Sequence, residues 1–340
     1  MFLRYALLLL TLALSGSALP IPHSRPFQIF FIDVEGGQAT LIVSPSGQSL
    51  LIDTGWRGFD GRDAERIVQA AKAAKIKELD YVLITHYHRD HVGGVPQLAN
   101  RMKIGTFVDH GPNMEDAKVV KEDYSDYVKT LNKAAQHMVV KPGDTIPIKG
   151  ITVQVITAAG EVISSPLAGG GQPNPFCAAS AKKEDDPTEN ARSLGVLITY
   201  GSFRLIDLGD LTWNKELALM CPSNPIGTVD VYLTSHHGLN QSGSPALVQA
   251  LHPRVAIMNN GAKKGGSPDA WQIVKDSPGL EDLWQLHYAM AGGKEHNVPD
   301  TFIANVDEFC EGKYLELTAQ SNGSFTVVNS RNKFSKAYKH

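Results

Sequence analysis

The 340-residue chain is poor in cysteine and nearly neutral. Its three cysteines, Cys177, Cys221 and Cys310, are too few and too scattered for a disulfide framework or a cysteine-rich zinc site. They allow one disulfide and one free thiol in an oxidising compartment, but their spacing does not identify the pair. The formal charge of −3 gives no global field that would attract nucleic acid, so only a local basic groove could bind it.

The sequence also lacks an apolar run long enough to cross a membrane. Residues 5–14 are apolar, but they make up only about half of a membrane-spanning helix. Arg4 precedes this run and the small residues 15–18 (SGSA) follow it. The pattern predicts a signal peptide over residues 1–18 and export to the periplasm or the extracellular space. We expect no transmembrane anchor in the mature chain, and the sequence leaves its oligomeric state open.

The order of expected elements indicates one large domain over residues 27–328. Strands occur in pairs early in the chain and later alternate with helices, which is typical of a layered α/β domain. Residues 158–190 are rich in glycine, proline and charge, so they predict a long loop insertion. Residues 329–340 predict a solvated basic tail.

The segment His86-Tyr87-His88-Arg89-Asp90-His91 carries most of the chemical information. It directly follows a short apolar strand expected at residues 81–84. Imidazole nitrogens and carboxylate oxygens are the natural ligands of zinc and similar divalent ions. His86 and His88 alternate along the backbone and can point the same way, whereas Asp90 and His91 would turn toward a neighbouring point. By accident this spacing should appear about once in a thousand such chains. The segment therefore predicts a site for two metal ions.

The H-x-H-x-D-H pattern is the hallmark of the metallo-β-lactamase fold superfamily of dinuclear metallohydrolases, which this sequence resembles. Two further segments resemble superfamily motifs: residues 51–55 (LIDTG) and residues 205–210 (LIDLGD). Three others are similar to the branch of competence-type DNA-uptake nucleases and phosphorylcholine esterases: residues 31–38 (FIDVEGGQ), 190–194 (NARSL) and 235–238 (SHHG). The resemblance extends from about residue 28 to residue 260. It implies a four-layer αββα sandwich.

The resemblance also assigns the metal ligands. His86 and His88 would hold the first ion, Asp90 and His91 the second, and Asp210 would bridge the two ions. One of His236 and His237 would complete the second site. The sequence cannot choose between these two, and the spare histidine would lie close to substrate as a proton donor. Asp90 would also orient the attacking water, which makes Asp90, His236 and His237 the candidate catalytic residues.

The chain departs from the superfamily pattern at the first metal. Many members have a further histidine where this sequence has Asn190. Either Asn190 or His110 is a candidate substitute ligand, although His110 also fits an ordinary surface position. We expect zinc, with manganese as the alternative. Asp33 and Asp53 are candidate partners that would orient the imidazoles, or they serve turns.

The resemblance implies an exported hydrolase in which a metal-bound hydroxide attacks the substrate. The branch favours a phosphodiester, although a fold alone does not assign a substrate. The alternatives are a β-lactam or lactone hydrolase acting on a small molecule, and a secreted metal-binding protein without catalysis. The missing histidine argues against a typical β-lactamase. The complete His/Asp set argues against loss of catalysis.

Overall fold

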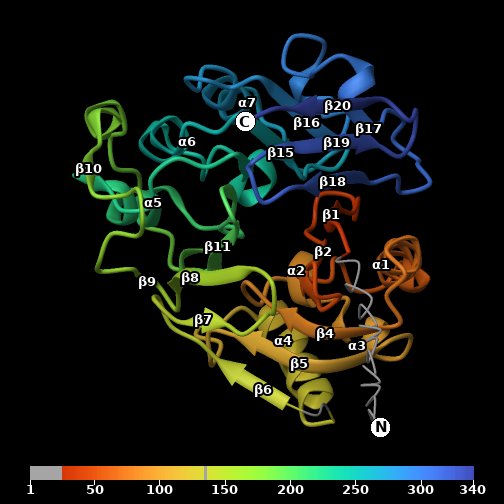
Figure 1. Cartoon of the computed structure of the whole chain (residues 1–340). Coiled ribbons are helices and arrows are strands. Elements are labelled where there is room, and N and C mark those ends of the chain that lie inside the picture. The colour runs from red at the N-terminus through yellow and green to blue at the C-terminus, as the bar shows by residue number, and fades with distance from the viewer. Residues whose placement is uncertain (1–24, 134–135) are drawn as a thin grey trace, which may run out of the picture.

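The computed structural model describes residues 25–133 and 136–340 (Figure 1). The predicted signal peptide at residues 1–18 lies outside this part of the chain. Within it, no helix is both long enough and apolar enough to span a bilayer.

Two large sheets form the centre of the molecule. The first sheet has the strand order β20 (Ser335–Tyr338), β19 (Phe325–Asn329), β18 (Leu315–Ala319), β1 (Phe27–Phe31), β2 (Thr40–Val43), β3 (Ser49–Ile52), β4 (Glu78–Leu83), β5 (Lys103–Asp109) and β6 (Gln136–Val139). The second has the order β17 (Ile303–Asn305), β16 (Asp282–His287), β15 (Val255–Met258), β14 (Val231–Leu233), β12 (Phe203–Asp207), β11 (Gly195–Tyr200), β8 (Thr152–Ala158) and β7 (Thr145–Ile146), and β9 (Glu161–Val162) pairs with β8. Strands β10 (Gln172–Pro173) and β13 (Ser223–Asn224) pair separately.

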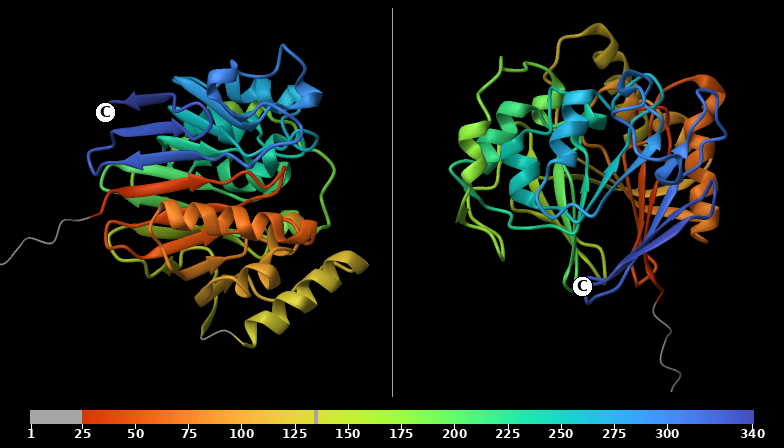
Figure 2. Two further views of the ribbon diagram at one scale, coloured as in Figure 1. Left: turned by 90° about the vertical axis from the view of Figure 1, so that its right-hand side faces the viewer. Right: turned by 90° about the horizontal axis from the view of Figure 1, so that it is seen from above.

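Helices lie along the outer faces of the two sheets (Figure 2). They are α1 (Arg62–Ala73), α2 (Arg89–Val92), α3 (Val95–Ala99), α4 (Lys118–Leu131), α5 (Trp213–Met220), α6 (Pro245–Leu251) and α7 (Pro268–Lys275). The short 3-10 helices are η1 (Phe59–Gly61), η2 (Pro175–Ala179), η3 (Glu189–Arg192), η4 (Ser235–Gly238), η5 (Met290–Gly292) and η6 (Asp300–Phe302).

The alternation of side chains along the strands produces the layers. In β1, Phe27, Ile29 and Phe31 enter the core between the two sheets, whereas Phe30 packs on the helix side. Helices α1, α3 and α4 cover the first sheet, and α5, α6 and α7 cover the second. The four-layer αββα sandwich is therefore confirmed.

The predicted basic tail is wrong at residues 335–338, which form the edge strand β20. Tyr338 is buried, and its ring stacks on Phe325 at 4.7 Å. Its hydroxyl donates to Asp282 Oδ2 at 2.7 Å and accepts from Trp284 Nε1 at 2.8 Å. The strand (SKAY) has only one large apolar residue, and Lys333 and Lys339 flank it, so the composition of this segment resembled a solvated terminus.

A disulfide ties the region of residues 158–190 to the second sheet's helices. Cys177 in η2 bonds Cys221, which directly follows α5. Cys310 is the free cysteine. The structure thus identifies the pair that the spacing left open.

We expect Tyr338→Ala to destabilise the fold by about 3–5 kcal/mol, because it empties a filled core position. The loss of both hydroxyl hydrogen bonds adds to this cost. Urea unfolding measures the change. Lys339→Ala, next to it and exposed, is the matched control and should leave the midpoint unchanged. Equal stabilities of the two variants would show that β20 does not belong to the core.

Candidate metal centre

The seven predicted site residues follow the ends of three strands. Residues 86–91 come after β4, Asp210 after β12, and His236 and His237 after β14. Strands β12 and β14 are parallel neighbours, so their ends lie at the same edge of the second sheet. Contact between the sheets brings the end of β4 to this edge. A Cβ on Gly209 would lie only 2.9 Å from Thr85 Cβ, so this close approach requires glycine.

Asp210 lies at the middle of the cluster, and its two oxygens face different histidines. Oδ1 lies 3.2 Å from His91 Nε2 and 3.4 Å from His237 Nε2. Oδ2 lies 3.4 Å from His236 Nε2 and 3.9 Å from His86 Nε2. This is the arrangement expected of a carboxylate that bridges two cations.

The side of the cluster facing Asp210 Oδ1 is the more compact one. Asp90 Oδ2 lies 3.3 Å from His91 Nε2 and 3.2 Å from His237 Nε2, and these two nitrogens are 3.2 Å apart. The ligand atoms of Asp90, His91, Asp210 and His237 all lie within 4.8 Å of one another. The geometry therefore groups His237, rather than His236, with Asp90 and His91.

Asp53 and Thr85 orient the imidazoles from behind. Asp53 Oδ2 lies 2.7 Å from His91 Nδ1 and accepts the Thr85 hydroxyl at 2.7 Å. Thr85 Oγ1 in turn lies 3.1 Å from His86 Nδ1. Both rings consequently present Nε2 to Asp210, and Asp53 occupies the position of an orienting partner. Asp33 does not lie here: it belongs to a different cluster with His287 and Cys310.

The backbone at the double histidine is strained. His236 and His237 have φ values of 53° and 56°, in the left-handed region that non-glycine residues seldom adopt. Each such residue costs about 1–2 kcal/mol. The conformation directs both rings toward Asp210, and strain of this kind is typical of functional sites.

The charge states of His86 and Asp210 fit metal ligation. Burial, followed by the neighbouring His91 and His88 rings, holds the pKa of His86 well below its ordinary value, so His86 is neutral. Burial alone would raise the pKa of Asp210, but the surrounding imidazoles, His237 first, hold it well below its usual range. His86 Nε2 and Asp210 Oδ1 are buried and have no hydrogen-bond partner among the described residues. Buried polar atoms rarely stay unpaired, and one divalent cation on each side of Asp210 would pair both.

The residues predicted to hold the first cation are less tightly clustered than those predicted to hold the second. His88 lies beside His86, with ring centroids 4.7 Å apart, but its Nε2 lies 2.9 Å from Glu115 Oε2. Sequence reasoning missed Glu115, because nothing in residues 110–117 marks this carboxylate as a partner of His88. The predicted substitute His110 instead pairs with Glu189 at 3.0 Å. The side-chain oxygen of Asn190 is buried and has no partner in the described chain.

Comparison with known proteins identifies the domain. Residues 32–174 match the model of the metallo-β-lactamase superfamily. The chain contains a metallo-β-lactamase superfamily domain. The resemblance inferred from the H-x-H-x-D-H pattern is thereby confirmed.

Two relatives of the metallo-β-lactamase domain are much longer proteins. "Recombination protein 2" of Haemophilus influenzae is 24% identical over 241 residues, covering 70% of this chain and 25% of that protein. "ComE operon protein 3" of Bacillus subtilis is 25% identical over 250 residues, covering 69% of this chain and 28% of that protein. This chain thus spans about a quarter of their length. The metallo-β-lactamase fold protein YhfI of Bacillus subtilis aligns with a TM-score of 0.48 and 14% identity over 76% of this chain and 95% of that one.

We expect Asp53→Asn to weaken metal binding by about 10–100-fold, because it removes the charge that orients His91. Competition with a chromophoric chelator measures the affinity. Asp80→Asn is the matched control. Its carboxylate likewise accepts a backbone N–H and a hydroxyl, both from Ser49 at 2.8 and 2.9 Å, but it does not contact the cluster. If both variants bind metal as the wild type does, Asp53 has no orienting role.

Proposed function

We propose that this chain is an exported hydrolase that uses two divalent cations to cleave a phosphodiester. The observation that carries the proposal is the position of Asp210, whose two oxygens face two separate sets of imidazoles. Zinc suits the histidine and carboxylate donors, and manganese is the alternative.

Cations bound at this cluster would supply an activated water as nucleophile and positive charge for the oxyanion. The protein residues divide the remaining tasks. On this proposal His86 and His88 hold the first cation, whereas Asp90, His91 and His237 hold the second. His236 is our candidate for the donor next to substrate, because its side chain is 9% exposed while that of His237 is 0% exposed.

Two features support a phosphodiester. The segments at residues 31–38, 190–194 and 235–238 resemble the competence-type and phosphorylcholine-esterase branch. The Lys264 ammonium also contacts Asp90 at the cluster, where it would attract a phosphate group. Arg89, Arg192 and Lys263 also pair with carboxylates, but their partners Asp123, Glu189 and Glu308 do not belong to the cluster around Asp210. Lys264 is therefore our candidate for the residue that binds the substrate anion.

The disulfide supports export. A disulfide such as Cys177–Cys221 persists in oxidising compartments and is rare in the cytosol of mesophiles. This agrees with the signal peptide that we propose for residues 1–18.

The decisive variant is Asp210→Asn. We expect it to release both metal ions and to abolish turnover of bis-(p-nitrophenyl) phosphate, because the bridging charge is lost. Asp207→Asn is the matched control on the same strand end. The Asp207 carboxylate binds Gln38 and the Gly209 N–H instead of the imidazoles, so this variant should keep both ions. Loss of only one ion from Asp210→Asn would contradict the bridging role.

A substrate panel tests the reaction class. The wild type should hydrolyse bis-(p-nitrophenyl) phosphate faster than a cephalosporin or a lactone, and excess chelator should stop the reaction reversibly. Preference for the cephalosporin or the lactone would replace the phosphodiester proposal with its alternative. Metal binding without turnover of any substrate would favour a non-catalytic metal-binding protein.

A further inference from the structure

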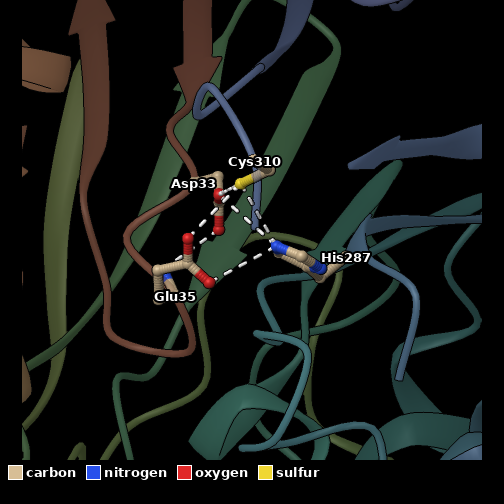
Figure 3. A group of neighbouring side chains, drawn as sticks. All are labelled: Asp33, Glu35, His287 and Cys310. Atoms are coloured by element: carbon tan, nitrogen blue, oxygen red, sulfur yellow. Dashed lines mark hydrogen bonds and ion pairs between the residues drawn. The ribbon is translucent and has the colours of Figure 1, made fainter. Parts of the chain in front are cut away.

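A second group of potential ligands shares no residue with the candidate metal centre. Figure 3 shows its four side chains. Asp33 and Glu35 come from the loop after β1, His287 ends β16, and Cys310 lies in the loop after β17. Cys310 Sγ lies 3.2 Å from Asp33 Oδ2, 3.3 Å from Glu35 Oε1 and 3.4 Å from His287 Nε2. His287 Nε2 lies 3.4 Å from Glu35 Oε2 and 3.8 Å from Asp33 Oδ2. Four donor groups from both sheets thus converge on one point.

Four of these five separations, 3.2–3.4 Å, are close to the edges of a tetrahedral zinc site, and the fifth is 3.8 Å. Zinc bonds of 2.0–2.3 Å at tetrahedral angles place neighbouring ligand atoms about 3.3–3.6 Å apart. The donors are one thiol, one imidazole and two carboxylates, which are all zinc ligands. We propose that Asp33, Glu35, His287 and Cys310 bind a structural divalent cation of the zinc type.

The charge of the cluster favours a cation. Asp33 and His287 are fully buried, and Arg66 is the guanidinium that pairs with both carboxylates, at 3.1 Å from Asp33 Oδ2 and 3.2 Å from Glu35 Oε1. Once Cys310 has lost its proton to bind a metal, two carboxylates and a thiolate carry three negative charges, and Arg66 offsets one of them. A divalent cation would offset the other two, so the metal-bound group would contain no unpaired buried charge. Arg66 would then orient the ligating carboxylates from outside.

An ion can reach this group from a surface cavity. Glu35, Arg66 and Cys310 line a hollow of about 770 Å³. The exposed rings of Phe59 and Phe309 flank it. A proposed metal site needs such an entry path.

A bound ion would fix the position of the loop that contacts Asp90 in the candidate metal centre. The same loop continues to Gln38, whose backbone N–H donates to the Asp90 carbonyl at 3.1 Å. The side chain of Gln38 donates to Asp207 Oδ2 at 2.8 Å. Fixing Asp33 and Glu35 to the second sheet therefore limits the movement of the loop that supports Asp90.

Binding must release the Cys310 proton. Burial, followed by the Asp33 charge, raises the pKa of the Cys310 thiol, so the metal-free group holds a neutral thiol. The cation competes with this proton, and its affinity should therefore rise with pH.

Cobalt provides a specific probe, because Cys310 is the single cysteine outside the disulfide. We expect the metal-free full chain to bind Co²⁺ and to develop a near-ultraviolet sulfur-to-cobalt charge-transfer band. The histidines and aspartates of the candidate metal centre contain no sulfur and cannot produce this band. The sulfur-to-cobalt band should disappear in Cys310→Ser and persist in Asp210→Asn. Total bound metal should fall by one ion per chain in Cys310→Ser.

A second measurement covers variants that fold poorly. In the zinc-loaded wild type a thiol reagent should modify Cys310 only after a chelator has removed the metal. His287→Gln should allow modification without a chelator. The proposal is overturned if cobalt saturation of the wild type gives no sulfur band, or if Cys310→Ser binds as much metal as the wild type. Either result would leave the group as a metal-free network of hydrogen bonds and ion pairs around Arg66. The outcome does not depend on phosphodiesterase activity.

Discussion

The structure depends on one electrostatic constraint, which is the burial of several imidazoles and carboxylates around Asp210. Their ligand atoms lie 3.2–3.9 Å apart with almost no access to water. Such groups are costly to bury unless cations pair with them. Asp53 and Thr85 limit the freedom of the rings, and the left-handed double histidine adds strain. The fold therefore holds an arrangement that becomes favourable when divalent ions bind.

The site residues that lie close together in the sequence could be predicted. The ligand-type residues at 86–91 are clustered within six positions, so their spacing alone indicates a metal site. The segment ending in Asp210 and the double histidine were recognisable because each follows an apolar strand and adjoins a glycine. The layered fold followed from the resemblance and from the alternation of elements. The structure confirms the sandwich and brings these three segments together.

Contacts between distant segments could not be predicted from the sequence. Glu115 reaches His88 across 27 positions, and its loop has no pattern that marks it. The pairing of Cys177 with Cys221 depends on how residues 158–190 pack beside α5. Strand β20 contains too little apolar sequence to be distinguished from a tail. In each case the contact depends on how distant segments pack together. Local patterns in a single sequence do not reveal such packing.

The loop after β1 contacts two separate clusters of side chains. Asp33 and Glu35 face Arg66, His287 and Cys310, whereas Gln38 reaches Asp90. Glu35 adopts a left-handed φ of 59°, which turns the chain between these two directions. A Cβ on Gly37 would lie 2.5 Å from the Asp90 carbonyl oxygen, so glycine is required at the point of contact. A shift of Asp33 and Glu35 would therefore move the backbone against Asp90, which couples the contacts of these two carboxylates to the geometry of the cluster around Asp210.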